Sequence, residues 1–289
     1  MAIHVMGAGG QLGRKVVQAL RDRGVQAGDI VCNVRSPDKV TDLAAQGLVV
    51  RRADYDDPSS MVEGFAGADA LLLIPTFMPP EPRVVQHGNA VHAAAEAGVG
   101  RLLFCSFGNG TPLSRFHIAP FMLYAESKTR LSGLPWTILR DGMYLDPIAD
   151  WVPELVEMGR LPYPVQHGKV SYISRDDLGR AIAGALVNDE TVDQAYDLTG
   201  PEALSMERLA EIISTVTGES VVFDRITDEE YAQICRDGEE DVPEFLIPIL
   251  TSLYHAVDNG EFGGVTDHVE QLAGSPAEDV ETYLRRVLS

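Results

Sequence analysis

Three glycines near the N-terminus have the spacing of a turn that holds phosphate groups. They follow the apolar run 3–6 and lead into the helical pattern 14–20. In such a turn the first glycine allows the tight bend, the second lets the backbone approach a pyrophosphate, and the third allows the helix to pack closely on the strand. The N–H groups at the helix start add positive potential. This arrangement predicts a dinucleotide site, formed by Gly7, Gly9, Gly10, Gln11, Leu12 and Gly13.

The end of the second predicted strand indicates which dinucleotide binds. A site for NAD places an acidic residue there to bind the ribose hydroxyls. Here the strand ends at Arg35 and Ser36, and Lys39 follows one turn later. A guanidinium can bind the 2′-phosphate of NADP through two hydrogen bonds. We therefore predict NADP(H), although Ser36 could also serve only as a helix cap and Lys39 only as an exposed charge.

Tyr124 and Lys128 have the spacing of a proton-donating pair. Side chains four residues apart lie on one face of a helix. The lysine charge would favour the phenolate and lower the pKa of the tyrosine, which could then protonate a carbonyl that is being reduced. Ser106, after the fifth predicted strand, could polarise the same carbonyl. The alternative is that Tyr124 is only a packing residue and Lys128 a surface charge.

The first half of the chain alternates short apolar runs with helical patterns. This alternation predicts an α/β fold with a doubly wound, Rossmann-type parallel sheet. The strands are expected at 3–6, 29–34, 49–52, 69–74, 101–106 and 136–140, and the helices near 11–24, 37–46, 58–65, 83–97 and 120–131.

The second half is richer in helical patterns and more acidic. We expect a cofactor-binding domain at 1–145 and a small helix-rich region at 146–289 that forms the substrate cleft. The helices are expected at 147–158, 175–187, 205–217, 227–236, 243–257 and 276–288, with short strands at 171–173, 195–198 and 220–224. Of the formal net charge of −20, residues 1–140 contribute +2 and residues 141–289 contribute −22.

Composition and charge exclude several classes of function. Nucleic-acid binding is disfavoured because the chain has a strongly negative net charge, whereas a phosphate backbone is bound by a basic surface. No apolar run is long enough for a membrane helix, and no basic, apolar leader precedes the first strand, so we expect a cytoplasmic protein without a membrane partner. His87 and His92 are not spaced as metal ligands, and we predict no metal. The three cysteines show no paired spacing and are expected to be buried thiols.

Several motifs then occur in an order that resembles a known family. The glycine turn is followed by Val34-Arg-Ser-Pro-Asp-Lys39, Ala53-Asp-Tyr-Asp-Asp57, Leu72-Leu-Ile-Pro75, Leu134-Pro-Trp-Thr-Ile-Leu-Arg140, Tyr172-Ile-Ser-Arg-Asp-Asp-Leu-Gly-Arg-Ala-Ile-Ala183 and Tyr196-Asp-Leu-Thr-Gly200. Together they resemble the NmrA-like branch of the atypical short-chain dehydrogenase/reductases over nearly the whole chain. That group includes NADPH-dependent quinone and triphenylmethane-dye reductases, and also redox-sensing regulators without turnover.

The resemblance implies further contacts to the cofactor. Asp54 and Tyr55 would lie near the adenine, Pro75 and Thr76 along the ribose, and Ser106 at the nicotinamide. Gly9 is a departure, because relatives often carry Thr or Ser there. Relatives also generally lack the tyrosine–lysine pair, and Glu126 falls where they place a polar residue.

Apolar residues after the predicted strands suggest a flat, hydrophobic substrate. The candidate residues for contact with the substrate are Phe77, Phe107, Met143 and Tyr144. We expect an NADPH-dependent oxidoreductase that reduces a quinone or a conjugated aromatic carbonyl compound. The alternative is a non-catalytic regulator that senses NADP(H) and binds a protein partner. Epimerisation of a nucleotide sugar fits less well, because this set offers few groups for a diphosphate. A homodimer is compatible with the sequence but is not indicated by it.

Overall fold

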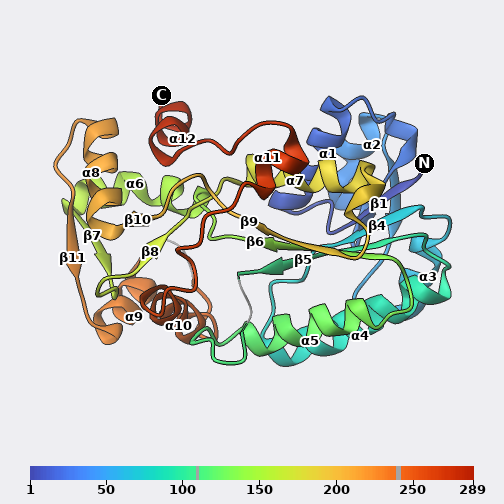
Figure 1. Ribbon diagram of the computed structural model, residues 1–289, viewed down its shortest axis with the longest axis horizontal. Helices are drawn as coiled ribbons and strands as arrows, with labels where there is room; N and C mark the ends of the chain where they lie inside the picture. Colours follow the sequence, from blue (N-terminus) through green and yellow to red (C-terminus); the bar gives the residue numbers. More distant parts are fainter. Residues whose placement is uncertain (109–110, 239–241) are drawn as a thin grey trace.

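Seven parallel strands form one central sheet in the computed structural model, which describes residues 1–108, 111–238 and 242–289. The strand order is β3-β2-β1-β4-β5-β6-β9 (Figure 1). The strands are β1 (Ile3–Met6), β2 (Ile30–Val34), β3 (Val49–Arg52), β4 (Ala70–Leu73), β5 (Leu102–Phe107), β6 (Trp136–Asp141) and β9 (Gln194–Leu198). The order reverses at β1, which pairs with β2 on one side and β4 on the other. Ligands of open α/β sheets bind beside such a reversal, at the carboxyl ends of the strands.

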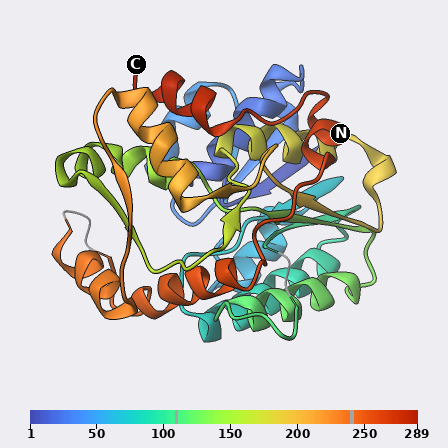
Figure 2. The ribbon, with the colours of Figure 1, turned by 60° about the vertical axis from the view of Figure 1, so that its left-hand side comes forward.

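Two layers of helices cover the sheet, one on each face (Figures 1 and 2). One layer holds α1 (Gln11–Asp22), α7 (Arg175–Val187) and α11 (His268–Ala273), with the short α2 (Thr41–Ala45) beside β3. The other layer holds α3 (Pro58–Phe65), α4 (Pro80–Glu96) and α5 (Ala119–Arg130). This double cover explains why central strands such as β4 are apolar and buried along their whole length.

The remaining elements gather at one end of the sheet (Figure 1). They are the helices α6 (Asp146–Met158), α8 (Met206–Thr217), α9 (Asp228–Asp237), α10 (Ile247–Asp258) and α12 (Val280–Val287). Two short sheets join them, one of β7 (Arg160–Tyr163) with β11 (Val222–Arg225), the other of β8 (Lys169–Val170) with β10 (Leu204–Ser205). Their core is continuous with the α4–α5 side of the sheet, and the rings of Tyr163, Tyr231 and Tyr254 pack together within it.

The second half of the chain also contributes to the Rossmann layers. β9 pairs with β6 at the sheet edge, and α7 packs along α1. Both elements lie within 146–289, the segment that was expected to form a separate region. Arg101, beside β5, holds this part in place, because its buried guanidinium donates hydrogen bonds to the carbonyl oxygens of Ala185, Leu186 and Asn188 and to Thr191 Oγ1.

Three local features differ from the sequence-based expectations. Helix α11 was not expected, because six residues are too few to show a helical period. Strand β7 was missed because Pro162 lies inside it, and proline argues against a strand. The strand expected at 171–173 lies slightly earlier, as β8, and Ile173 forms only a single bridge, to Tyr144.

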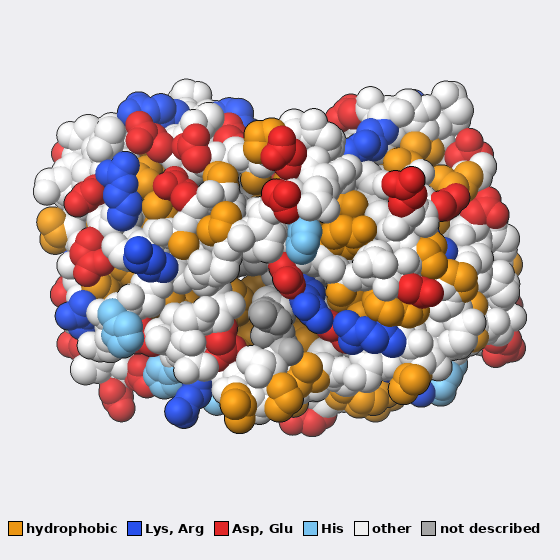
Figure 3. Space-filling view, viewed as in Figure 1, with side chains coloured by type: hydrophobic (Ala, Val, Ile, Leu, Met, Phe, Trp, Pro, Cys, Tyr) orange, Lys and Arg blue, Asp and Glu red, His pale blue; other side chains and the backbone are white. Residues whose placement is uncertain are grey.

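All three cysteines, Cys32, Cys105 and Cys235, are unpaired and buried. Burial raises the pKa of Cys32 to about 11, and it also raises the pKa of Cys105 and of Cys235. Basic and acidic side chains are interspersed on the face drawn in Figure 3. Within the described residues, no helix is long and apolar enough to span a membrane. The same residues hold no cluster of three or more side chains suited to a metal ion.

Candidate active site

The glycine turn lies between β1 and α1, and its backbone packs too tightly for side chains. Gly7 has a φ of +88°, a conformation that favours glycine. A Cβ atom on Gly13 would lie 2.2 Å from the carbonyl oxygen of Gly7. Gly10 caps α1 without a side-chain hydrogen bond, and the first turn holds no acidic residue. The first N–H groups of α1 are therefore available to a pyrophosphate, and the turn fits a dinucleotide.

Gly9 is confined by a neighbouring element. A Cβ atom there would lie 3.0 Å from Cγ1 of Val40, so the serine or threonine of some relatives would require Val40 to move. Arg14 steadies the same turn, because its Nε donates to the carbonyl oxygen of Gly9 at 3.2 Å while its guanidinium pairs with Asp42.

Arg35 and Lys39 lie at the carboxyl end of β2, and both are exposed. Their side chains form no hydrogen bond or ion pair within the described part of the chain, and Ser36 caps the following turn without a side-chain bond. Three polar side chains at this strand end are thus available to a phosphate group. No acidic residue occupies the position that an NAD site requires.

The loops after β3 and β4 are tied to each other by hydrogen bonds. Tyr55 is buried, and its hydroxyl donates to the carbonyl oxygen of Ile74 at 2.7 Å. Thr76 Oγ1 donates to Gln86, whose amide donates to Asp56 at 2.9 Å. These bonds hold the segment that contains Pro75 and Thr76 beside the glycine turn. Tyr55 thus supports the segment after β4 through its bond to Ile74. Asp54, the partly exposed residue before Tyr55, accepts a hydrogen bond from the N–H of Asp56.

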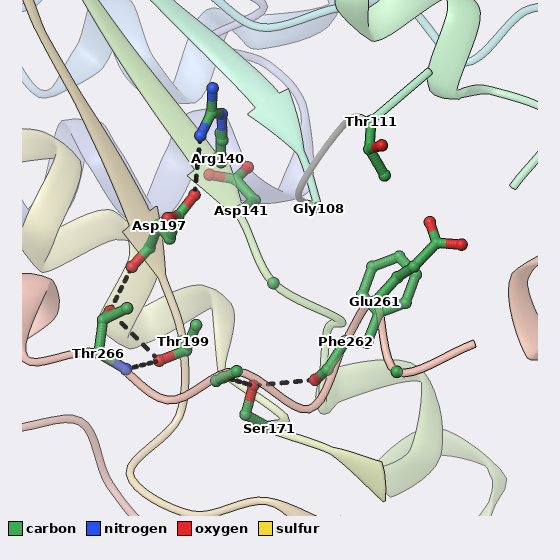
Figure 4. Close-up of a pocket in the computed structure, with 13 residues that line it drawn as sticks. Gly108, Thr111, Arg140, Asp141, Ser171, Asp197, Thr199, Glu261, Phe262 and Thr266 are labelled. Atoms are coloured by element: carbon green, nitrogen blue, oxygen red, sulfur yellow. Dashed lines mark hydrogen bonds and ion pairs between the residues drawn. The ribbon is translucent and has the colours of Figure 1, made fainter. Parts of the chain in front are cut away.

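A cavity of about 180 Å³ lies at the carboxyl ends of β5, β6 and β9 (Figure 4). It is lined by Gly108, Thr111, Arg140, Asp141, Gly142, Ser171, Asp197, Thr199, Gly260, Glu261, Phe262, Gly264 and Thr266. Hydrogen bonds fix one wall of the cavity. The hydroxyl of Thr266 donates to the carbonyl oxygen of Asp197, and the hydroxyl of Ser171 donates to that of Phe262. The cavity therefore combines a polar wall with one aromatic ring, that of Phe262.

Two of the four substrate candidates, Phe107 and Tyr144, meet beside this cavity. The ring of Phe107 lies 5.9 Å from that of Tyr144 and 5.7 Å from those of Phe116 and Phe262. Phe77 is 69% exposed, and its ring lies 6.3 Å from that of Phe245, so it does not join this cluster. Met143 is buried in the core.

Asp141, the last residue of β6, is an almost fully buried carboxyl group. Its Oδ2 accepts a hydrogen bond from the Tyr144 hydroxyl at 3.0 Å, and its Oδ1 has no partner in the described structure. Burial raises the pKa of Asp141 to about 8, although the bond from Tyr144 acts in the opposite direction. At neutral pH this side chain is mostly the neutral acid.

Helix α5 presents different residues to the sheet and to its neighbour. Tyr124 is 37% exposed, and its hydroxyl would lie 3.2 Å from a Cβ atom on Gly88 of α4. Glu126 is buried and accepts hydrogen bonds from Arg140 of β6 and from Arg130. Burial alone would raise the pKa of Glu126, but the bonds and charge of Arg140 outweigh it and hold the pKa below its usual value.

Ser106, near the end of β5, is buried, and its Oγ has no hydrogen-bond partner among the described residues. It pairs in register with Arg140 on β6, so it lies beside the ion pair with Glu126. The structure thus brings Ser106 near Glu126 and Arg140, whereas Tyr124 contacts α4. The role of Tyr124 and Lys128 as a proton donor stays a prediction, and the observed contact favours the packing alternative.

Three residues of this edge were missed by sequence reasoning: Arg83, Arg140 and Asp141. Arg140 and Asp141 end the apolar strand β6, and the rule that identified polar groups at other strand ends would also have found them. Arg83 lies in the first turn of α4, and its guanidinium lies 4.3 Å from the centre of the Phe121 ring. No sequence signal distinguished it from a surface arginine.

The chain belongs to the NmrA-like family, whose model matches residues 1–284. It is 29% identical to quinone oxidoreductase 2 of Escherichia coli over 276 residues, which cover 95% of this chain and 94% of that protein. It is 26% identical to an NAD(P)H azoreductase of Xenophilus azovorans over 283 residues, or 98% and 96% of the two chains.

Solved structures share the whole fold. Triphenylmethane reductase of Citrobacter in complex with NADP(H) is 31% identical, with a TM-score of 0.91 and coverage of 97% of this chain and 98% of that chain. A Staphylococcus aureus protein described as a nucleoside-diphosphate-sugar epimerase is 30% identical, with a TM-score of 0.91 and coverage of 99% and 100%. The family and the Rossmann-type fold that the sequence predicts are therefore confirmed.

Proposed function

We propose that the protein reduces a quinone or a related conjugated aromatic carbonyl compound. The protein is an NAD(P)H-dependent oxidoreductase with NADP(H) as its cofactor, in keeping with its oxidoreductase relatives and a neighbour that holds NADP(H). The observation that carries the substrate proposal is the cluster of Phe107, Phe116, Tyr144 and Phe262 at the carboxyl ends of β5 and β6. Such a surface suits a flat apolar acceptor.

The chain's own residues would hold the cofactor along the sheet edge. The N–H groups at the start of α1 would bind the pyrophosphate, and Arg35, with Ser36 and Lys39, would bind the 2′-phosphate. Asp54 would lie at the adenine, and Pro75 and Thr76 would follow the ribose. Tyr55, whose hydroxyl bonds to Ile74, would support that loop rather than bind the cofactor directly.

When bound, NADPH supplies a hydride at the nicotinamide end. The protein contributes orientation and a site from which water is largely excluded. A quinone that accepts a hydride becomes the monoanion of its hydroquinone, which is stable enough to take the second proton from water. The reaction therefore does not require a tyrosine acid, which agrees with the contact of Tyr124 with α4 rather than with the pocket.

The proposal is tested by the oxidation of NADPH, followed by nicotinamide absorbance, against quinones, aromatic enones and azo and triphenylmethane dyes. NADH is measured in parallel. We expect turnover with quinones and a preference for NADPH. In Arg35→Gly the KM for NADPH should rise about 10- to 100-fold, because a charge-assisted contact is worth about 1.5–3 kcal/mol. The KM for NADH should change little.

Arg208→Gln is the matched control, since Arg208 is an exposed arginine on α8 that pairs with Glu211. It should leave both KM values unchanged. Tight NADPH binding without turnover of any acceptor would contradict the proposal and favour the regulator that senses NADP(H) and binds a protein partner. Turnover of a nucleotide sugar would favour an epimerase.

The expectations about the substrate, the partners, the cellular location and the oligomeric state stay predictions. They are a small hydrophobic or aromatic substrate, no nucleic-acid partner, a cytoplasmic location and a homodimer. Sedimentation of the purified protein with and without NADPH would test the last of these.

A further inference from the structure

Arg83 carries a half-buried positive charge without a counter-charge. Its Nε is fully buried and has no hydrogen-bond partner, and its guanidinium forms no hydrogen bond or ion pair with any described residue. Among the described residues, the guanidinium lies over an aromatic face, that of the Phe121 ring on α5. Burial lowers the pKa of Arg83 to about 10, so the side chain is still a cation at neutral pH.

Three other buried or partly buried arginines have hydrogen-bond or ion-pair partners. Arg101 donates to four oxygen acceptors, Arg140 pairs with Glu126 and Asp197, and Arg175 pairs with Asp146. An unpaired charge in partly desolvated surroundings costs free energy. Arg83 is therefore not explained by folding, and its unused donors point to a ligand that supplies the missing acceptor.

The place of Arg83 identifies where this ligand would lie. Tyr55 and Tyr144, which follow β3 and β6, lie close enough to the guanidinium to raise the pKa of Arg83, against the effect of burial. One turn along α4, Gln86 bonds to Thr76 after β4. Phe121 lies at the start of α5. The charge is thus at the start of α4, on the side of the sheet where the strands end, near Tyr144 and outside the β2 strand end that carries Arg35.

We propose that Arg83 binds the oxygen of the acceptor on which negative charge develops during reduction. This inference rests on the proposed quinone reductase activity and identifies the substrate class more closely. With NADPH bound, the quinone would gain a hydride, with its two electrons, from the C–H bond that breaks at the nicotinamide, and NADP⁺ would be left. The quinone becomes a hydroquinone monoanion, one oxygen of which carries the charge, and that oxygen then takes a proton from water. A guanidinium stabilises this anion more than the neutral quinone, as a catalytic group should.

The same charge selects among acceptors. A neutral or anionic quinone places an oxygen acceptor opposite the donors of Arg83. A cationic triphenylmethane dye offers no such oxygen, and its positive charge would lie near another positive charge. We therefore expect wild-type protein to favour quinones over cationic dyes, and this preference to depend on Arg83.

The test compares Arg83→Ala and Arg83→Lys with wild-type protein. In Arg83→Ala we expect kcat/KM for a neutral naphthoquinone to fall about 10- to 100-fold, the size of a lost charge-assisted contact. The value for a cationic triphenylmethane dye should stay constant or rise. Guanidinium ion added to Arg83→Ala should restore part of the quinone activity, which loss of a merely structural contact would not allow. Arg83→Lys should retain an intermediate rate.

A binding measurement separates this inference from the proposed function. A hydroxylated naphthoquinone, an anion at neutral pH, is titrated into the NADP⁺-loaded protein while tryptophan fluorescence is followed. Arg83→Ala should bind it at least tenfold more weakly than wild type, whereas Arg285→Met, which changes an exposed arginine on α12 paired with Glu281, should not.

Each other outcome overturns the inference. If wild-type protein turns over quinones and Arg83→Ala is equally active and binds the anion equally well, Arg83 does not bind the acceptor. If Arg83→Ala weakens NADPH binding and leaves the preference among acceptors unchanged, the residue binds the cofactor instead. If wild-type protein neither reduces nor binds any quinone, the proposed function and this inference fail together.

Discussion

Asp141 shows how one buried side chain links the site to the pH dependence of folding. Its carboxyl group ends β6, contacts Tyr144 and lies close enough to Cys105 of β5 to affect that thiol. The pKa of Asp141 is about 8 in the folded protein, compared with an ordinary value of 3.8. Between these pH values the unfolded chain has lost this proton while the folded protein keeps it. The contribution of Asp141 to stability therefore falls as pH rises through this window.

Asp141→Asn should remove this dependence. Asparagine has nearly the same shape and no proton to lose, so the variant should match wild type near pH 4. It should become progressively more stable than wild type up to about pH 8, by at most about 1.4 kcal/mol per pH unit. Urea unfolding at several pH values measures this difference. Asp38→Asn, at an exposed position, should behave as wild type. A difference between Asp141→Asn and wild type that does not change with pH would contradict the prediction.

At the residue scale, the position of a side chain could be predicted where it directly follows a strand, whereas its role as a binding residue stays a prediction. The glycine turn and Arg35 directly follow strands, so their positions at the sheet edge could be predicted from a few neighbouring residues. Arg83 could not be found in this way. Arg83 stands out because its buried Nε has no hydrogen-bond partner among the described residues. That absence results from how α4 and α5 pack against the sheet.

At the scale of the helix, α5 separates two sets of side chains. Glu126 faces Arg140 on the sheet, and Tyr124, two positions earlier, lies about 200° around the helix and contacts α4. A four-residue spacing predicts which side chains share a face, but it does not say which face meets the active site. That depends on the register of α5 against β6, which the sequence does not reveal.

Tyr124→Phe should therefore keep kcat for quinone reduction within about twofold of wild type, because the change removes only a hydroxyl at the α4 contact. Glu126→Gln is the contrasting variant on the same helix. It leaves Arg140 and Arg130 without their shared carboxylate, and breaking a buried ion pair costs about 3–5 kcal/mol. Steady-state kinetics and thermal unfolding of both variants measure these effects. A loss of kcat of more than tenfold in Tyr124→Phe would restore the proton-donor hypothesis.

Most elements could be predicted because strand and helix patterns alternate clearly. The exceptions have physical causes, such as the proline inside β7 and the shortness of α11. The order in which distant elements join could not be read from local patterns. The pairing of β9 with β6 brings together residues that are far apart in sequence.

At the scale of the whole molecule, residues 1–145 should not form a stable domain alone. Such a fragment contains β1–β6 but lacks β9, so β6 would become an open edge. It also lacks α7, and the buried residues of α1 that face α7 would contact water. We expect no cooperative thermal transition by circular dichroism. A fragment of residues 1–275 keeps β9, α7 and α11 and should retain a transition. Cooperative unfolding of 1–145 would show that the first half folds independently.

The buried cysteines have a consequence for the proposed reduction of quinones. Quinones are electrophiles that add to thiolates by conjugate addition, and only the deprotonated, accessible sulfur reacts readily. In this protein burial raises the pKa of Cys32, Cys105 and Cys235, and all three lie beneath the surface. Each thiol is thus both protonated and shielded at neutral pH. The protein would then resist arylation of these thiols by the proposed quinone substrates for as long as it stays folded, because unfolding would expose the three sulfur atoms.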